Sequence, residues 1–349
     1  MTSSFKINSK TIGNASKAYL IAEIAQAHDG SLGFAHAFID AAFDAGADAV
    51  KFQTHIASAE STKNEKFRIK FSYEDQTRFD YWKRMEFTLA QWIELAKHAK
   101  EKKITFLSSP FSLEAFDILQ KIEMPAWKIA SGELDNEPLI DLILETKKPV
   151  LISTGMSSWS EIDSIVDLML KNNTDFCLMQ CTSKYPTPLS QIGLNVIDQY
   201  KTKYDCNVGL SDHSGSIFPP IAAITRGADL VEIHLTLDKR MFGPDVASSL
   251  TVDEFSLVSK ARDSYFEMMS NPVDKDILSG ELNSNKMLFG RSLALEKSQL
   301  KGTIITKEHL RLKKPGGGLS YAQIANILGS RLIRNVNSDE LLTLDDFER

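Results

Sequence analysis

The stretch AWKIASGELDNEPLIDLILETKKPVLIST, residues 126–154, consists of two apolar runs joined by an amphipathic helical pattern. The runs at 126–131 and 149–154 are almost continuously apolar, which is typical of parallel strands covered by helices on both faces. The same pattern repeats along the chain, and it predicts further strands at residues 18–25, 48–53, 104–108, 175–181, 207–212 and 230–236. The sequence therefore predicts eight parallel strands.

Amphipathic patterns lie between these strands and after the last one, and they predict helices at residues 34–45, 89–102, 113–123, 137–147, 159–171, 217–227 and 253–269. Eight such units within about 250 residues favour a closed (β/α)8 barrel, the TIM barrel. The alternative is an open, doubly wound sheet, which normally carries a G-x-G-x-x-G fingerprint after its first strand. Gln-Ala-His-Asp-Gly follows the first strand here, so we expect the barrel.

Two segments interrupt this repeat of strands and helices. Residues 55–87 form a long polar insertion rich in charged and aromatic residues, and a loop of this length is usually a lid or an oligomer contact. Residues 271–284 are polar and rich in turn formers, which predicts a linker. The short β-like pieces within residues 285–349 predict a small second domain that follows a barrel domain of residues 1–270.

The composition is that of an ordinary folded protein, with 43% hydrophobic and 25% charged residues. No apolar run approaches about 18 residues and no apolar signal segment is visible, so we expect neither a membrane span nor secretion. The net charge of −6 argues against non-specific binding to nucleic acid. The three cysteines cannot form a disulfide framework, which favours a cytoplasmic protein.

Polar residues concentrate at the predicted carboxyl ends of the strands, where barrel enzymes place their catalytic groups. Lys51 and Lys128 lie within the apolar runs VKFQ and WKIAS, and a buried lysine needs an anionic partner. A single such lysine is most often a structural, ion-paired residue. Two of them beside strand-end hydroxyls instead predict a pocket for a small phosphorylated carboxylate.

Two histidines predict a metal site. His213 and His234 lie on the seventh and eighth strands, which are neighbours. Two imidazoles with a carboxylate and open positions for water suit a divalent transition metal such as Mn²⁺. Glu23 lies on the first strand, which adjoins the eighth in a closed barrel, so it could reach that metal or its water. The other histidines show no such arrangement and are expected to be structural; they are His28, His36, His55, His98 and His309.

The order and spacing of several motifs resemble those of the sialic acid synthase family. These motifs are EIAQAHDG, GADAVKFQT, FLSSPF, WKIASGELDN, LISTGM, QCTSKYPTP, VGLSDHS, EIHLTLD and FGPDVASS. The tail sequence GRSLALEKSQLKGTIITKEHLRLKKPGGG resembles the family's antifreeze-like domain, a small β-rich SAF domain of the β-clip type. The resemblance implies condensation of phosphoenolpyruvate and water with an open-chain N-acyl amino-sugar aldehyde. The products would be a nine-carbon 3-deoxy-2-ulosonic acid and phosphate, released with C–O cleavage.

The resemblance also implies roles for individual residues. Phosphoenolpyruvate would be bound by Lys51, Ser109, Lys128, Ser131, Ser153, Ser183 and Ser211. The sugar would be bound by Gln53, Glu133, Tyr185, Asp245 and Lys314. His213 and His234 would hold Mn²⁺, or alternatively Mg²⁺ or Co²⁺, and Glu23 would hold a metal-bound water. The metal would polarise the aldehyde oxygen, the two lysines would offset the substrate's charge, and Glu133 would handle a proton near the sugar.

Three positions depart from the pattern of the family. Ile233 precedes His234 where an arginine is common, Ser183 replaces a common asparagine, and Lys314 replaces a tail arginine that resembles an N-acetyl contact. A lysine cannot reproduce the planar two-donor fork of arginine. These changes leave the acceptor open between N-acetylmannosamine and a diacetamido-dideoxy hexose that leads to legionaminic- or pseudaminic-type acids.

Two alternative functions agree less well with the sequence. A related barrel enzyme would condense phosphoenolpyruvate with a phosphorylated aldose, and it would need a second, arginine-rich anion pocket. A structural protein would bind carbohydrate or ice through its tail, but residues 285–349 contain few threonines for a flat binding array. The resemblance further implies a domain-swapped homodimer, in which Lys314 of one chain reaches the sugar site of the other.

Overall fold

The computed structural model describes residues 4–348, and the chain divides into two compact units. The first unit ends at Ser270 and the second begins at Asn271. Each unit has its own hydrophobic core. Among the described residues, no helix is both long enough and apolar enough to cross a membrane.

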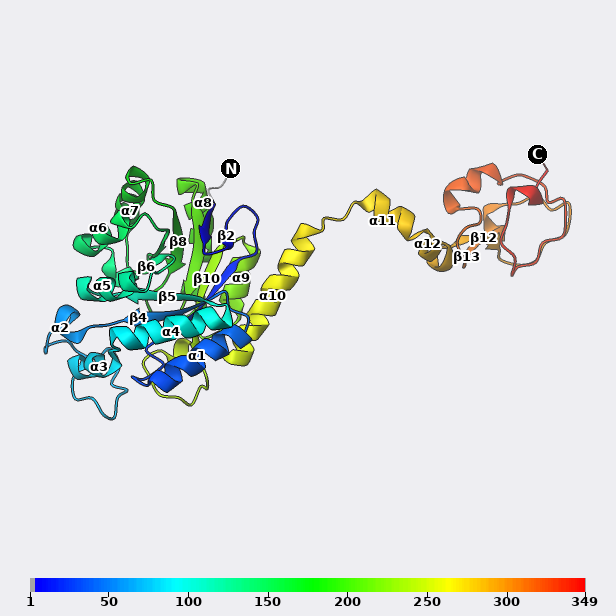
Figure 1. Ribbon diagram of the computed structural model, residues 1–349. Coiled ribbons are helices and arrows are strands. Elements are labelled where there is room, and N and C mark those ends of the chain that lie inside the picture. Colours follow the sequence, from blue (N-terminus) through cyan, green and yellow to red (C-terminus); the bar gives the residue numbers. More distant parts are fainter. Residues whose placement is uncertain (1–3, 349) are drawn as a thin grey trace. The chain divides into compact units, whose positions relative to one another are not determined.

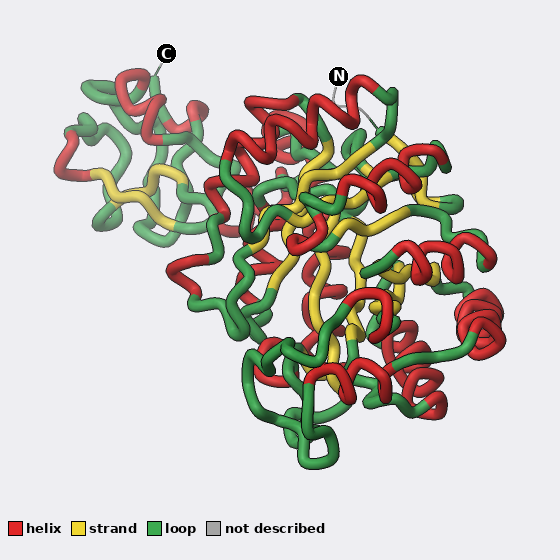
Figure 2. Tube along the Cα trace, turned by 90° about the vertical axis from the view of Figure 1, so that its left-hand side faces the viewer, coloured by secondary structure: helices red, strands yellow, loops and turns green. Residues whose placement is uncertain are grey.

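Eight parallel strands of the first unit are wound into a barrel (Figure 1, Figure 2). Their spatial order is β5-β4-β3-β10-β9-β8-β7-β6, and β5 also lies beside β6, although no regular ladder joins these two strands within residues 4–348. This near-closed arrangement confirms the predicted (β/α)8 barrel. The strands are β3 (Tyr19–Ala25), β4 (Ala49–Thr54), β5 (Thr105–Pro110), β6 (Trp127–Ile129), β7 (Val150–Ser153), β8 (Phe176–Cys181), β9 (Asn207–Asp212) and β10 (Leu230–Thr236).

Helices cover the outside of the barrel, and short polar side chains begin several of them. Ser31, Thr88 and Ser158 each accept a hydrogen bond from a backbone N–H of the first turn. The helices are α1 (Leu32–Asp44), α4 (Leu89–Lys102), α5 (Leu113–Lys121), α6 (Glu137–Glu145), α7 (Trp159–Lys171), α8 (Leu194–Tyr204), α9 (Phe218–Thr225) and α10 (Val252–Ser270). The shorter elements are β11 (Leu250–Thr251) and the 3-10 helices η1 (Ser131–Glu133), η2 (Leu189–Gln191) and η3 (Val246–Ser248). Helix α8 was not among the predicted helices, since Gly193 begins it without a side-chain cap.

A short hairpin that the sequence analysis did not predict precedes the barrel. Its strands β1 (Phe5–Ile7) and β2 (Lys10–Ile12) pair antiparallel. Ile7 is buried in the same core as the barrel strands, and Asn8 donates a hydrogen bond of 3.2 Å to the hydroxyl of Thr105 at the start of β5. The hairpin therefore lies at the amino-terminal ends of the strands, opposite the end where barrel enzymes carry their sites.

The insertion between β4 and α4 is a folded wall with its own apolar cluster. It contains the helices α2 (Ala57–Glu60) and α3 (Arg78–Met85). The buried side chains of this cluster are Ala57, Tyr81, Trp82 and Met85, with Phe67, Phe71 and Phe79 packed against them. Arg84 of α3 donates a hydrogen bond of 2.7 Å to the carboxylate of Asp29 in the loop after β3, which ties the insertion to the barrel.

The second unit is small and mostly irregular, as expected for the tail. Its strands β12 (Ser292–Leu295) and β13 (Leu310–Lys313) pair antiparallel, and they follow the helices α11 (Lys275–Glu281) and α12 (Asn283–Phe289). The buried core is formed by Leu293, Leu295, Ile305, Leu310, Leu319, Ile327, Leu332, Val336, Leu342 and Phe347. Its 3-10 helices are η4 (Lys307–His309), η5 (Tyr321–Asn326) and η6 (Leu344–Asp346).

The prediction of a turn-rich linker over residues 271–284 missed helix α11, and helix α12 begins at the end of that segment and was not predicted either. Asp274 begins α11 by accepting hydrogen bonds from the backbone N–H groups of Asp276 and Ile277. Neither helix has a buried residue. Each helix has only seven residues, which is shorter than the window of about 11–18 residues over which helical periodicity can be recognised in a sequence.

Candidate active site

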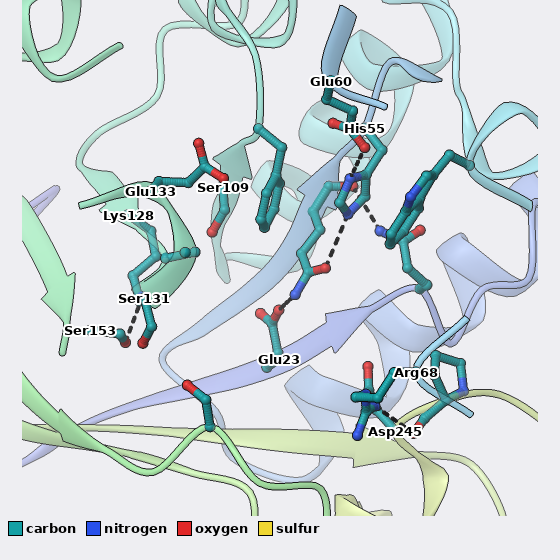
Figure 3. Close-up of a pocket in the computed structure, with 18 of the residues that line it drawn as sticks. Glu23, His55, Glu60, Arg68, Ser109, Lys128, Ser131, Glu133, Ser153 and Asp245 are labelled. Carbon is teal, nitrogen blue, oxygen red and sulfur yellow. Dashed lines mark hydrogen bonds and ion pairs between the residues drawn. The ribbon is translucent and has the colours of Figure 1, made fainter. Parts of the chain in front are cut away.

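A cavity of about 850 Å³ lies at the carboxyl ends of the barrel strands (Figure 3). It is lined by every barrel residue that the sequence analysis proposed for the site: Glu23, Lys51, Gln53, Ser109, Lys128, Ser131, Glu133, Ser153, Ser183, Tyr185, Ser211, His213, His234 and Asp245. Lys314 belongs to the second unit, where its ammonium lies 5.7 Å from the centre of the Phe289 ring. The barrel thus gathers residues that are far apart in the sequence around one space.

Lys51 is the centre of a buried ion cluster in this cavity. Its side chain is only 2% exposed, and its Nζ lies 2.7 Å from Glu23 Oε2 and 3.5 Å from Glu232 Oε2. It also donates a hydrogen bond of 3.2 Å to the hydroxyl of Ser109. Glu23 stands next to Lys51 in the β3–β4 register, and Glu232 comes from β10 on the other side of β3. The ammonium group of Lys51 therefore forms ion pairs with carboxylates from two strands, β3 and β10.

Lys128 on β6 is buried as well, but its hydrogen-bond partners are neutral. Its Nζ donates hydrogen bonds to the hydroxyl of Ser153 at 2.7 Å and to the carbonyl of Ile129 at 3.0 Å. Burial lowers the pKa of Lys128, against the opposing attraction of Glu232. Because its direct partners carry no charge, Lys128 has positive charge to offer to an anion in the cavity.

A glycine lets the hydroxyls of the cavity approach the backbone after β7. The N–H of Gly155 donates a hydrogen bond of 2.9 Å to Ser131 Oγ. A Cβ atom at Gly155 would lie 2.4 Å from Ser183 Oγ and 2.6 Å from Cys181 Sγ. Any side chain at this position would therefore displace groups that line the cavity.

Burial and neighbouring charges set different proton affinities for the carboxyl groups of the site. Burial raises the pKa of Glu23 to about 7, against the attraction of Lys51. Burial acts in the same direction on Glu232, but Lys51 and Lys128 hold its pKa below the usual value. Burial also raises the pKa of Glu133, whose carboxylate accepts a hydrogen bond of 2.8 Å from Asn136. Carboxyl groups whose pKa values differ in this way can take separate roles in proton transfer.

The two histidines predicted to bind metal lie side by side, with ring centres 5.1 Å apart. Burial lowers the pKa of His213 to about 4, and it lowers the pKa of His234 well below its usual range. Both are therefore neutral imidazoles near pH 7. The carbonyl of Thr182 lies 3.3 Å from His213 Nδ1, so that nitrogen can donate to it and leave Nε2 available as a ligand.

The protein ligands to a metal would be these two histidines rather than a larger cluster. Within residues 4–348, no group of three or more histidine, cysteine, aspartate and glutamate side chains is arranged to hold an ion. The carboxylate of Glu23 is instead directed to Lys51 and to Gln53, whose Nε2 donates a hydrogen bond of 2.8 Å. The donor set fits an open site in which water or substrate supplies the remaining ligands.

His55 was expected to be only structural, but it lines the cavity and contacts Gln53. Its Nε2 lies 3.2 Å from Gln53 Oε1, and its Nδ1 lies 2.6 Å from Glu60 Oε1 (Figure 3). Its ring is stacked between Trp82 and Phe111, at centre distances of 3.9 and 4.3 Å. Residues two apart along a strand lie on the same face, so the spacing of two residues between Gln53 and His55 could have predicted that His55 also faces the cavity.

The remaining histidines are not among the described residues that line the cavity. His28 is buried and accepts a hydrogen bond of 3.1 Å from the N–H of Gly30. His36 and His98 contact each other between α1 and α4, with their Nδ1 atoms 2.8 Å apart. His309 lies in the second unit.

The insertion adds an arginine that the sequence analysis did not single out. Arg68 forms an ion pair of 3.0 Å with Asp245, and its guanidinium lies 4.3 Å from the ring centre of Tyr185 (Figure 3). Residues 55–87 are rich in charged and aromatic side chains, which indicated a functional segment. No pattern within this segment distinguished Arg68 from its other charged residues. The contact depends on two loops that are distant in sequence.

The cavity therefore has two chemically different parts. Buried lysines and serine hydroxyls form an anion-binding part around Lys51 and Lys128. Carboxyl, guanidinium and aromatic groups form the other part, where Arg68 contacts both Asp245 and Tyr185. Glu133 lies near Ser109 and Lys128, on the side of the anion-binding part (Figure 3). The first suits a small phosphorylated carboxylate, and the second suits an uncharged molecule with many hydroxyl groups.

The fold and the cavity define a (β/α)8-barrel protein with an anion site, a pair of neutral histidines and a small β-rich tail unit. Comparison with family models makes this more specific. The model of the NeuB family matches residues 38–273, and that of the SAF domain matches residues 300–348. The chain belongs to the NeuB family and carries a C-terminal SAF domain, in agreement with the predicted resemblance.

Known proteins match over nearly the whole chain. The N,N'-diacetyllegionaminic acid synthase of Campylobacter jejuni is 34% identical, covering 93% of this chain and 99% of that protein. The N-acetylneuraminate-9-phosphate synthase of Homo sapiens is 30% identical, covering 95% of this chain and 93% of that protein. The crystal structure of N-acetylneuraminic acid synthetase from Leptospira borgpetersenii, in complex with citrate, has a TM-score of 0.72 at 28% identity, covering 82% of this chain and 97% of that one.

Proposed function

We propose that the protein condenses phosphoenolpyruvate with an open-chain N-acyl amino-sugar aldehyde and water, giving a nine-carbon sialic-acid-type 2-ulosonic acid and phosphate. The observation that carries this proposal is the pair of buried lysines, Lys51 and Lys128, that bond serine hydroxyls in one part of the cavity. Lysines supply charge and hydroxyls supply directed hydrogen bonds to a doubly anionic substrate. Relatives named as legionaminic acid and N-acetylneuraminate-9-phosphate synthases support this reaction class.

In this proposal the anion-binding part holds phosphoenolpyruvate. Lys51 and Lys128 offset the charge of its carboxylate and phosphate groups. The hydroxyl groups around them orient the substrate, and they belong to Ser109, Ser131, Ser153, Ser183 and Ser211. The two lysines already lie in the cavity with their side chains buried, so little reorganisation accompanies binding.

The bond-forming steps take place between the anion-binding part and the sugar-binding part of the cavity. C3 of phosphoenolpyruvate attacks the aldehyde carbon, and the aldehyde oxygen takes up a proton. Water then adds at C2, and phosphate leaves as its C–O bond breaks. Glu133 is our candidate for handling the proton near the sugar, because burial raises the pKa of its carboxyl toward the working range. Gln53, Tyr185 and Asp245 orient the sugar.

We infer that His213 and His234 hold a divalent ion, Mn²⁺ or alternatively Mg²⁺ or Co²⁺. Both imidazoles are neutral near pH 7 and both line the cavity, which supports this role. When bound, such an ion would supply Lewis-acid polarisation of an oxygen atom of the acceptor. Glu23 would orient a water molecule of that site.

The charges of the cavity wall favour an acceptor without phosphate. The two arginines of the wall are already paired, Arg68 with Asp245 and Arg78 with Glu65, each at 3.0 Å. A phosphorylated aldose needs a second cationic pocket, and paired arginines beside further carboxylates do not provide one. We therefore rank the phosphorylated aldose as the alternative substrate.

The proposal predicts phosphate release from phosphoenolpyruvate only in the presence of an N-acyl hexosamine. The assay compares N-acetylmannosamine and diacetamido-dideoxy hexoses with N-acetylmannosamine 6-phosphate and with simple phosphorylated aldoses. We expect turnover with one of the uncharged sugars, and mass spectrometry should detect the nine-carbon acid. Turnover with phosphorylated aldoses alone would favour the alternative, and no phosphate release with any acceptor would refute both.

We further propose a domain-swapped homodimer in which Lys314 of one chain reaches the sugar site of the other. The tail unit has a small core of its own, and small units usually dock on a larger surface. A cavity that is open to water would weaken the electrostatic interactions inside it, so a partner that covers the cavity would aid the reaction.

Complementation tests this assembly. One variant ends at Ser270 and the other carries Glu133→Gln, and we expect each to be inactive alone. In a mixed dimer the intact barrel of the shortened chain would receive the tail of the other chain, so about one site per dimer should be active. Inactive mixed dimers, identified by native mass spectrometry, would exclude the exchange of tails.

A further inference from the structure

Arg68 joins the insertion to two loops of the barrel that carry proposed sugar contacts. Its Nη2 donates hydrogen bonds to Asp245 Oδ1 at 3.0 Å and to the carbonyl of Pro244 at 3.1 Å, both in the loop after β10 (Figure 3). Its guanidinium lies 4.3 Å from the ring centre of Tyr185, in the loop after β8. One side chain therefore connects three segments that the chain folds separately.

Both partners of Arg68 depend on its charge. Burial raises the pKa of Asp245, and Arg68 opposes that effect. Besides the guanidinium, the ring of Tyr185 contacts the rings of His213 and His234, at centre distances of 4.2 and 6.0 Å. Cation–π attraction holds an aromatic ring in such a position. Without Arg68, the carboxylate of Asp245 would bind a proton more readily and the ring of Tyr185 would lose its cationic neighbour.

Arg68 also keeps donors for a ligand. A guanidinium has five N–H groups, and both hydrogen bonds to the β10 loop use Nη2. Within residues 4–348, Nε and Nη1 form no hydrogen bond with a protein acceptor. The side chain is 39% exposed and lines the cavity. Its remaining N–H groups match the carbonyl and hydroxyl oxygens of a sugar.

We propose that Arg68 determines specificity for the acceptor sugar, anchored through Nη2 on Asp245 and Pro244 and binding sugar oxygens through Nε and Nη1. This inference rests on the proposed function. Lys314, the proposed sugar contact of the tail, is a lysine, and a lysine has no planar fork of donors. The insertion supplies a fork from inside the barrel unit.

Arg68→Met tests the proposal, because methionine keeps much of the length and loses the charge and the fork. We expect KM for the sugar to rise about 10- to 100-fold, the usual effect of losing charge-assisted hydrogen bonds. KM for phosphoenolpyruvate and kcat should change by less than about twofold, because the interaction concerns sugar binding only. Arg68→Lys should recover only part of the loss, because it restores the charge without the fork.

Lys83→Met is the matched control. Lys83 lies on α3 of the same insertion, pairs with Glu86 at 2.7 Å and is not among the described residues that line the cavity. We expect its KM for the sugar to stay within about twofold of wild type. An equal rise in both variants would overturn the proposal and indicate that any loosening of the insertion weakens sugar binding.

Hydrogen–deuterium exchange of the full chain separates this inference from the proposed function. We expect faster exchange of the loops around Tyr185 and Asp245 in Arg68→Met than in Lys83→Met, whether or not the enzyme turns over. An active wild type with an unchanged sugar KM in Arg68→Met would refute the role of Arg68 and leave the function intact. Absence of turnover in wild type would refute the function, and unchanged exchange would then refute the anchoring by Arg68 as well.

Discussion

Lys51→Met is expected to destabilise the protein by about 3–5 kcal/mol, the usual cost of leaving a buried charge without its partner. Lys51 is the cation that lies 2.7 Å from Glu23 and 3.5 Å from Glu232, and all three side chains are buried. The same change should raise KM for phosphoenolpyruvate roughly 10- to 100-fold. Urea unfolding and steady-state kinetics measure the two effects separately.

The loss of stability should depend on pH. Burial already raises the pKa of Glu23 to about 7, and without Lys51 it would rise further. A carboxyl group whose pKa is higher in the folded than in the unfolded state stabilises the fold at low pH, and this stability is lost as pH rises through the folded pKa. The difference between Lys51→Met and wild type should therefore be larger at about pH 8 than at about pH 5.

Lys128→Met is the matched control for this stability effect. Its hydrogen bonds go to the neutral groups Ser153 and Ile129, so its removal leaves no directly paired carboxylate behind. We expect a similar rise in KM for phosphoenolpyruvate but a smaller loss of stability. Equal losses of stability in the two variants would contradict the assignment of Lys51 as the main partner of the buried carboxylates.

Removal of the divalent metal is expected to abolish turnover, and Mn²⁺ should restore it. His213 and His234 are the neutral, adjacent imidazoles of the cavity, so the double variant His213→Ala with His234→Ala should no longer bind Mn²⁺ in titration calorimetry. The fold should persist, because these side chains end strands and contribute little to the apolar core.

His36→Ala is the matched control for the metal experiment, because it removes a histidine on α1 that contacts His98 outside the cavity. We expect it to bind Mn²⁺ as wild type does. Undiminished Mn²⁺ binding by the double variant, or full activity of metal-free enzyme, would show that the two histidines are not the ligands of an essential ion.

The architecture of the barrel and the composition of its site could be predicted from local sequence patterns. The apolar runs predicted all eight strands of the barrel to within a few residues, because strands that are buried on both faces have little freedom in composition. Strand-end polar residues such as Lys51, Lys128, His213 and His234 all line the cavity, because the barrel brings the carboxyl ends of its strands together.

Contacts between segments without such periodicity required the structure. The helices α11 and α12 have only seven residues each, too few for a helical periodicity to mark them in the sequence. Glu232 belongs to the predicted strand at residues 230–236, but its place near Lys51 follows from the order of β10, β3 and β4 in the barrel.

The sequence by itself determined the strands, the tail domain and the set of strand-end side chains, because a continuous apolar run and the amphipathic pattern that follows it are local properties of the chain. Only the tertiary structure decided which partner each polar group has. His55 faces Gln53 and Glu60, and Arg68 pairs with Asp245, which is far away in the chain. A side-chain hydrogen bond or ion pair requires distances near 3 Å and a matching orientation, and neither is encoded in the spacing of residues along the sequence.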